Sequence, residues 1–189
     1  SGLSTDTYQA QLTELGQFHP VTRMDMDPAL NQAIWKDMEP LEGANQVTRP
    51  KQDTQVLLQH PVHMDERNQP QTLVAVREVD NGRSMVVATD SLWHWSFPAG
   101  HHGADTRLYD TFWSNAFRWL IKDPELDLVR VRVSTERATP GEEVSVNVEV
   151  FTPGYRPAAH HPVNLMLLRR DPDSGAMQEV WRPENTMTN

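Results

Sequence analysis

The pattern of hydrophobic and polar positions is clearest between residues 81 and 120, where a strand period gives way to a helix period. The turn dipeptide Asn81-Gly82 precedes an apolar, β-branched run over residues 84–89, which predicts a buried strand. From Asp105 onward, apolar residues recur every three or four positions and predict one broad helix face: Leu108, Tyr109, Phe112, Trp113, Ala116, Phe117 and Leu120. The segment therefore predicts a strand, a polar loop and an amphipathic helix.

The preceding part of the chain mixes helical and strand patterns. Apolar spacing predicts a short helix over residues 6–15 that ends at Gly16, and the pair Asp27-Pro28 predicts a second helix that Pro40 ends. Residues 54–59 and 72–79 read as strands, and the polar, proline-flanked stretch 60–71 reads as a loop. Residues 72–89 together predict a β-hairpin.

The pattern after Glu125 is that of short, alternating strands. Valines alternate with polar residues over 128–134 and 144–150, and further strands are predicted over 163–168 and 178–181. This texture is typical of a β-sandwich of the immunoglobulin or fibronectin type. We therefore expect a mixed α/β domain over residues 1–125 and a β-sandwich segment over 126–189.

Neither predicted part has all the strands that its fold needs, since a doubly wound sheet and a sandwich both require more. The simplest interpretation is that the sequence is a piece excised from a longer protein. The alternative is that both parts share one compact core. Strand edges left open would favour protein partners, the missing parts of the same chain, or self-association into a homo-oligomer.

Composition excludes several function classes. The chain has 189 residues, a formal charge of −9 and no cysteine. The acidic balance argues against a nucleic-acid surface and against binding to anionic lipid. Thiol nucleophiles, disulfides and thiolate metal sites are ruled out within this sequence. No apolar run approaches the roughly 20 residues that cross a bilayer, so no direct membrane insertion is expected. No cofactor is predicted.

Three groups of motifs occur in a suggestive order. Leu15-Gly16 leads to His19-Pro20-Val21, a helix ending at Trp35 and a Pro-Leu-x-Gly turn over residues 40–43. The strand residues Val56-Leu57-Leu58 follow, and then residues 89–95 (TDSLWHW) and a helix over 109–120 with Phe-Trp and Arg-Trp-Leu elements. Over about residues 8–122, this order resembles the C-terminal half of the glutamine amidotransferase-like domain of large bacterial membrane-anchored proteins.

The resemblance implies a partial flavodoxin-like α/β fold, an extracytoplasmic (periplasmic) setting in a membrane-anchored parent protein, and a neighbouring immunoglobulin-like segment. It does not imply an activity. Class I amidotransferases use a cysteine on a strand–helix elbow and a later His–Glu pair, and no His-x-Glu stands at the expected place here. His94 lies between two tryptophans, where family members usually have arginine. A non-catalytic domain acting in binding or assembly at the bacterial envelope is therefore expected.

Candidate catalytic residues lie at the end of the strand over 84–89. His94, with Asp90 and Ser91 beside it, could form a nucleophile–base arrangement. The alternative function is thus a hydrolase or amidotransferase whose nucleophile lies upstream of this sequence, with His94 as base. The simpler interpretation is that Trp93 and Trp95 fill the space between sheet and helix while His94 faces solvent or a backbone carbonyl.

A candidate metal site comprises His101, His102 and Asp105, because imidazole and carboxylate suit zinc or nickel. Asp105 is equally explained as a helix cap, and a structural zinc site usually needs four ligands. The His60-x-x-His63 pair is predicted to lie in a loop, because Pro61 disfavours a helix, and His160-His161 is predicted to be solvated.

Overall fold

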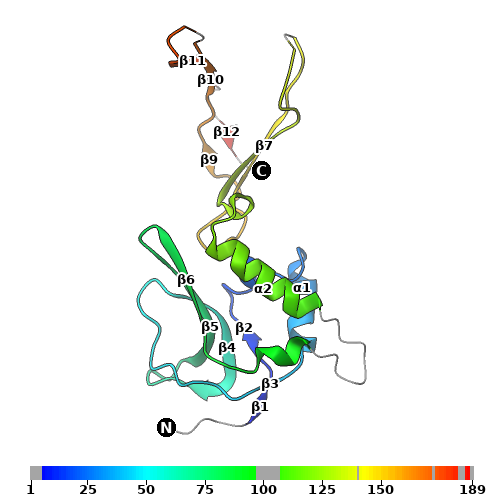
Figure 1. Cartoon of the computed structure of the whole chain (residues 1–189), viewed down its shortest axis with the longest axis vertical. Coiled ribbons are helices and arrows are strands. Elements are labelled where there is room, and N and C mark those ends of the chain that lie inside the picture. Colours follow the sequence, from blue (N-terminus) through cyan, green and yellow to red (C-terminus); the bar gives the residue numbers. More distant parts are fainter. Residues whose placement is uncertain (1–5, 97–106, 140, 172, 183–185, 188–189) are drawn as a thin grey trace. The chain divides into compact units, whose positions relative to one another are not determined.

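The structure is a computed structural model that describes residues 6–96, 107–139, 141–171, 173–182 and 186–187 (Figure 1). The chain divides into two compact units, Ser1–Asp127 (unit 1) and Leu128–Asn189 (unit 2). The predicted boundary near Glu125 lies in the short 3-10 helix η3 (Pro124–Leu126), close to the end of unit 1.

Unit 1 is built on a four-stranded antiparallel sheet in the order β2-β4-β5-β6. Its strands are β2 (Gln11–Leu12), β4 (Gln55–Met64), β5 (Pro70–Val79) and β6 (Gly82–Val87). The predicted hairpin is confirmed as β5 and β6, which pair without a break from Val74–Val87 to Val79–Gly82. Asp80 has a φ of 51° in the connecting turn, a left-handed conformation that aspartate tolerates.

Two helices accompany this sheet. Helix α1 (Pro28–Asp37) begins as predicted, because the Asp27 carboxylate accepts hydrogen bonds from the Ala29 and Leu30 N–H groups. Helix α2 (Arg107–Leu120) supplies the long amphipathic element. It ends in a Schellman motif, in which the Asp123 N–H reaches the Arg118 carbonyl and Lys122 adopts a φ of 57°.

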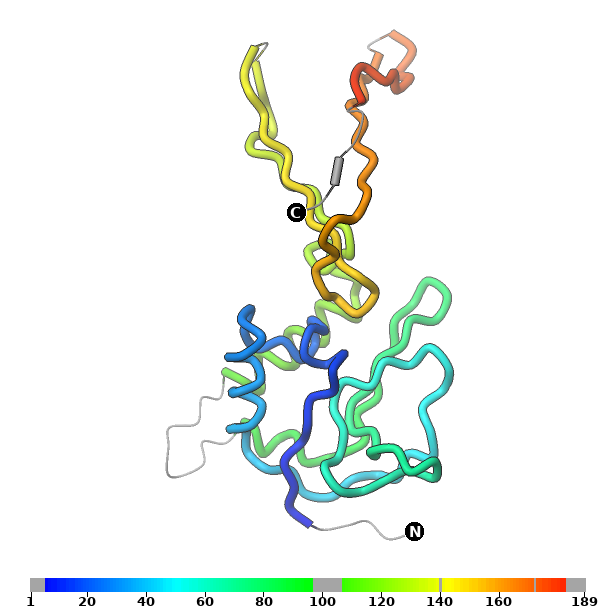
Figure 2. The backbone as a smooth tube through the Cα atoms, turned by 180° about the vertical axis from the view of Figure 1, so that it is seen from behind, coloured from blue at the N-terminus to red at the C-terminus, as the bar shows by residue number. Residues whose placement is uncertain are grey.

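The N-terminal segment joins the sheet to α1. Strand β1 (Thr7–Tyr8) pairs with β3 (Leu41–Glu42), and β2 then pairs with the edge of β4. In Figures 1 and 2 this dark-blue segment lies between α1 and the sheet. The 3-10 helices η1 (Pro20–Thr22) and η2 (Leu92–Ser96) both contact α2.

The core of unit 1 contains an aromatic cluster drawn from three elements. Trp35 of α1, Trp95 of η2 and Phe112 of α2 are each at most 5% exposed. Their rings meet edge to face, with centroids 5.4 Å apart for the two tryptophans and 5.5 Å for Trp95 and Phe112. Such edge-to-face pairs add stabilisation to the burial itself, so this cluster fixes η2 against both helices.

The helix predicted over residues 6–15 is wrong. Tyr8 and Leu12 lie in strands, because pairing with β3 and β4 overrides a helix-like spacing. Gly16 does not end a helix. A Cβ atom at Gly16 would lie 2.1 Å from the Leu57 carbonyl oxygen, so only glycine permits this close approach to β4.

The loop predicted over 60–71 is also wrong for most of its length. Strand β4 continues through Met64 and β5 begins at Pro70, which leaves a short turn closed by Asp65. The Asp65 carboxylate accepts hydrogen bonds from the Arg67 and Gln69 N–H groups. Register shifts along β4 accommodate Pro61 within the strand.

The architecture is thus a mixture of helices and small sheets, with no closed barrel in the ranges that the structure describes. Every strand pair described is antiparallel. The flavodoxin-like expectation is for a mainly parallel sheet, and no parallel pair occurs in the described residues.

Unit 2 contains three two-stranded antiparallel sheets in its described part. These are β7 (Val129–Val133) with β8 (Val146–Val150), β9 (Pro162–Val163) with β12 (Thr186–Met187), and β10 (Leu167–Arg170) with β11 (Met177–Trp181). The predicted strand over 163–168 is split between β9 and β10. Val129, Val131 and Val133 remain 51–59% exposed, so the described strands lack the filled interior of the predicted sandwich.

Candidate functional site

The segment from Thr89 to Ser96 contains the predicted catalytic residues and follows directly after β6. It is anchored to a second segment, residues 39–43, which surrounds β3. The Trp95 indole N–H donates to the Glu39 carbonyl at 3.0 Å, and Thr89 Oγ1 donates to the Gly43 carbonyl at 2.9 Å. The two segments therefore hold η2 in place through side chain to backbone bonds at both ends.

The Ser91 hydroxyl is buried in a directional chain of hydrogen bonds. It accepts from the Glu42 N–H at 3.0 Å and lies 2.8 Å from Thr89 Oγ1. Because Thr89 donates its own proton to the Gly43 carbonyl, Ser91 donates to Thr89. The Ser91 side chain, in a residue only 4% exposed, thus uses both its donor and an acceptor site for structural contacts.

Tyr8 meets the same carbonyl from β1. Its hydroxyl donates to the Gly43 oxygen at 2.9 Å. Burial raises the pKa of Tyr8, and the nearby Asp90 charge raises it further, while a hydrogen bond with Thr89 lowers it. The phenol therefore stays protonated at neutral pH and acts as a donor to the backbone.

His94 and Asp90 do not join Ser91 in a catalytic arrangement. His94 Nδ1 lies 3.2 Å from the Pro40 carbonyl oxygen, which fits a protonated Nδ1 that donates to this carbonyl. Asp90 is exposed. Across the described residues, no hydrogen bond or ion pair joins the side chain of His94 to those of Asp90 and Ser91, so these three side chains do not form a nucleophile–base pair with one another. His94 instead faces a backbone carbonyl.

The two tryptophans beside His94 differ in environment. Trp95 is buried in the aromatic cluster, whereas Trp93 is 53% exposed and meets the His94 ring edge to face at 4.2 Å. The interpretation that both tryptophans fill the space between sheet and helix is therefore wrong for Trp93, while Trp95 is buried against rings of the two helices α1 and α2.

The candidate metal residues His101, His102 and Asp105 lie outside the described residues. Elsewhere in the described ranges, no group of three or more His, Cys, Asp or Glu side chains is arranged to hold a metal ion. No helix described in the chain combines the length and apolar character that crossing a bilayer requires. His160 and His161 are exposed, as predicted.

His60 and His63 form a close pair that their spacing alone did not reveal. They lie in β4, not in the predicted loop, and their rings stack in parallel with centroids 4.1 Å apart. His60 Nδ1 accepts from the N–H groups of Val62 and His63. Burial lowers the pKa of His60 to about 4, and the neighbouring His63 lowers it while Asp6 opposes the shift. The neutral ring therefore acts as a structural acceptor for the backbone that follows Pro61.

His19, which the sequence places in the His19-Pro20-Val21 motif but not among the candidate site residues, is a second buried histidine. It is 1% exposed and packs edge-on against Trp119, with the ring centroids 5.3 Å apart. Its Nδ1 accepts from the Val21 N–H and caps η1. Burial lowers the pKa of His19 to about 3, and the cations Arg83 and Arg23 lower it further.

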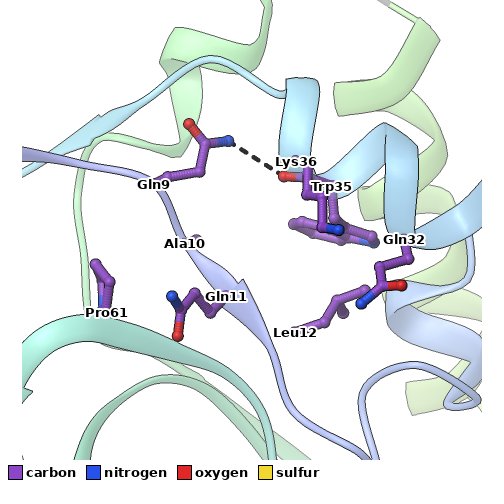
Figure 3. A pocket seen from close by; sticks show the side chains of 8 residues that line it. All are labelled: Gln9, Ala10, Gln11, Leu12, Gln32, Trp35, Lys36 and Pro61. Atoms are coloured by element: carbon purple, nitrogen blue, oxygen red, sulfur yellow. Dashed lines mark hydrogen bonds between the residues drawn. The ribbon is translucent and has the colours of Figure 1, made fainter.

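A pocket of about 330 Å³ lies between β2 and α1 (Figure 3). Its lining includes Gln9, Gln11, Gln32 and Lys36, and no acid or histidine. Gln9 donates its amide N–H to the carbonyls of Trp35 and Met38, at 3.1 and 2.6 Å, so part of its hydrogen-bonding capacity holds α1 against the N-terminal segment. These residue types offer polar contacts and no nucleophile–base pair.

Comparison of the chain with models of known protein families, with curated proteins and with solved structures found no match. The function is therefore inferred from the chain's own side chains and motifs.

Proposed function

We propose that this chain is a non-catalytic, extracytoplasmic module of the amidotransferase-like kind, joined to an immunoglobulin-like segment, that acts in binding or assembly at the bacterial envelope. In this proposal residues 8–122 correspond to the C-terminal half of the amidotransferase-like domain. The support for that kinship is the ordered set of motifs, from Leu15-Gly16 to the Arg-Trp-Leu element at residues 118–120.

One observation carries the non-catalytic part of the proposal. Ser91, the only hydroxyl among the three candidate catalytic residues, is held by Glu42 and Thr89, and His94 is turned toward the Pro40 carbonyl. A working nucleophile needs a base within hydrogen-bond reach, and in the described residues no hydrogen bond joins the Ser91 hydroxyl to the His94 ring. Ser91 and His94 are both explained as parts of the anchor of η2.

The experiment is a glutamine hydrolysis assay on the full-length parent protein, with ammonia and glutamate both measured. His94→Gln and Ser91→Ala are compared with the wild type, and Ser96→Ala serves as the matched control because its hydroxyl donates to the nearby Trp93 carbonyl within η2. We expect no glutaminase turnover that depends on His94 or Ser91. A loss of measurable turnover in His94→Gln, with folding intact by circular dichroism, would overturn the proposal.

The envelope setting needs its own test. A tagged parent protein is followed by cell fractionation and by protease treatment of intact and osmotically shocked cells. The proposal expects the residues of this chain to be cut only after the outer barrier is opened. Protection until the inner membrane is lysed would place them on the cytoplasmic side and contradict it.

A further inference from the structure

A groove of about 430 Å³ lies on one face of the β5–β6 hairpin, bounded by the stretch from Val47 to Thr54. This volume is in the usual range for pockets that take small-molecule ligands, about 300–1,000 Å³. The groove belongs to unit 1 and includes none of the residues around His94, so it is a separate candidate site.

The groove lies on the hairpin face opposite the one that contacts α2. Side chains alternate across a strand, so Arg77 and its partner Ser84 share one face while Glu78 and its partner Arg83 share the other. Arg83 donates to the Trp119 carbonyl of α2 at 2.9 Å, which identifies its face as the helix-contacting one. Val79 and Val86, which line the groove with Arg77, remain 44% and 56% exposed.

The lining combines apolar residues with charged residues that are all cationic. Six of the twelve lining residues are apolar, namely Val47, Pro50, Ala75, Val76, Val79 and Val86. Of these, Val76 is 1% exposed and its side chain belongs to the opposite face of the hairpin, so the other five form the floor. The three charged ones are Arg49, Lys51 and Arg77, and none of the twelve is acidic. The chain as a whole carries a formal charge of −9, so this local excess of cations runs against the overall balance.

The carboxylate nearest in sequence to Arg77 does not neutralise the groove from within. Glu78 projects to the opposite face, where it accepts a hydrogen bond from Arg83 at 2.9 Å. Arg77 Nε is a buried donor without a hydrogen-bond partner in the described part of the chain. A buried donor left unmatched carries a desolvation cost that an incoming acceptor can remove.

We propose that this groove binds a small amphipathic carboxylate, a ligand whose apolar body lies against the valines and whose carboxylate meets Arg77 and the cations Arg49 and Lys51. The planar guanidinium of an arginine can hold a carboxylate through two parallel hydrogen bonds. The apolar floor contributes to affinity through burial, and the charge selects anions over neutral or cationic ligands of the same shape.

The test uses three probes with the same eight-carbon body: octanoate, 1-octanol and octylammonium. Each is titrated into the full chain and followed by amide chemical shifts and by calorimetry. We expect saturable binding of octanoate with shifts centred on Arg77, Ser84 and Val86, and affinity about tenfold or more below this for octylammonium. Added salt weakens the octanoate binding because the contact is ionic.

Arg77→Gln weakens the binding of octanoate by about tenfold, since the substitution removes a charge-assisted hydrogen bond to the carboxylate. Lys51→Gln, in the exposed loop, provides a second variant if Arg77→Gln fails to fold. Arg67→Gln is the matched control, because Arg67 is exposed in the β4–β5 turn and does not line the groove. His94→Gln leaves octanoate binding unchanged, which separates this site from the proposed function.

Equal affinity for all three probes would overturn the proposal, as would shifts centred away from the hairpin. If Arg67→Gln weakened octanoate binding as much as Arg77→Gln and Lys51→Gln do, the binding would depend on the net charge of the protein and not on the groove. That result would also contradict the proposal.

Discussion

Acidification should destabilise unit 1 through His19. This side chain is enclosed against Trp119, and its pKa is lowered from 6.5 to about 3 in the folded protein. In the unfolded chain the same imidazole is solvated and titrates near 6.5. Between these two values the unfolded state holds one more proton than the native state, so the free energy of unfolding falls as the pH falls.

The magnitude follows from the separation of the two pKa values. Each pH unit below 6.5 costs about 1.4 kcal/mol until the folded pKa is reached, so a drop from about pH 7.5 to about pH 5 removes about 2 kcal/mol. His60 contributes in the same direction, since its folded pKa is also lowered, to about 4. A loss of this size is a large fraction of the stability of a typical domain.

The assay is urea unfolding at several pH values, followed by tryptophan fluorescence. Five of the six tryptophans lie in unit 1, so this signal reports mainly on that unit. His19→Asn is the informative variant, because the asparagine oxygen can still accept from the Val21 N–H while the titrating ring is gone. His160→Asn is the matched control, an exposed histidine in unit 2 with a left-handed backbone (φ 55°) that asparagine accepts.

His19→Asn should lower stability at neutral pH through lost packing, yet reduce the loss between about pH 7.5 and pH 5 by about 2 kcal/mol. His160→Asn should follow the wild-type slope. Equal losses of stability in His19→Asn and the wild type over this range would refute the reasoning, because the buried neutral histidine would then not be the titrating group.

Three further substitutions test the local packing by chemical unfolding. Gly16→Ala should destabilise unit 1 by about 3 kcal/mol, because its Cβ would lie 2.1 Å from the Leu57 carbonyl oxygen. The control Gly82→Ala should change the stability little, because its Cβ would have no neighbour closer than 3.4 Å. Equal effects of the two substitutions would contradict the close approach at Gly16 as the cause. Ser91→Ala should lower the stability by about 1–2 kcal/mol, because the Glu42 N–H loses its acceptor. Ser96→Ala should lower it by less than about 0.5 kcal/mol. No loss of stability in Ser91→Ala would show that the hydrogen-bond chain does not anchor this segment. Lys122→Gly should stabilise by about 0.5–1 kcal/mol, since glycine adopts a φ of 57° without strain, and a loss of stability would show that the lysine side chain matters more than the backbone.

Local signals predicted those elements that local chemistry decides. The Asp27-Pro28 pair predicts the start of α1, and the Asn81-Gly82 dipeptide marks the β5–β6 hairpin, although the two turn residues are Asp80 and Asn81, and Gly82 already pairs with Val79. The prediction for residues 6–15 is wrong because Tyr8, Leu12 and Leu15 have helical spacing, while pairing with residues more than 30 positions away decides the conformation of the first two. Long-range pairing of this kind has no counterpart in a local hydrophobic pattern.

The candidate site shows the same division. Sequence proximity suggested Asp90, Ser91 and His94 as a group, but the partners of Ser91 and His94 come from residues 40–42 and Thr89. The basic groove was missed because Arg49 and Lys51 are separated from Arg77 along the chain. A signal was present in the alternation of Ala75, Arg77 and Val79, which puts a cation in line with apolar residues on one strand face.

Contacts between α2 and the first forty residues mean that the N-terminal part of the chain can complete its packing only after α2 has been synthesised. The Asn115 amide donates to the Arg23 carbonyl across 92 positions, and Trp35 reaches its ring partners Trp95 and Phe112 only when both have been synthesised. Helix α1 therefore leaves the ribosome before its packing partners have been synthesised, so the nascent chain exposes Trp35, a residue that is 2% exposed in the finished fold. In the proposed envelope setting, the same delay would keep the chain unfolded during its export across the membrane.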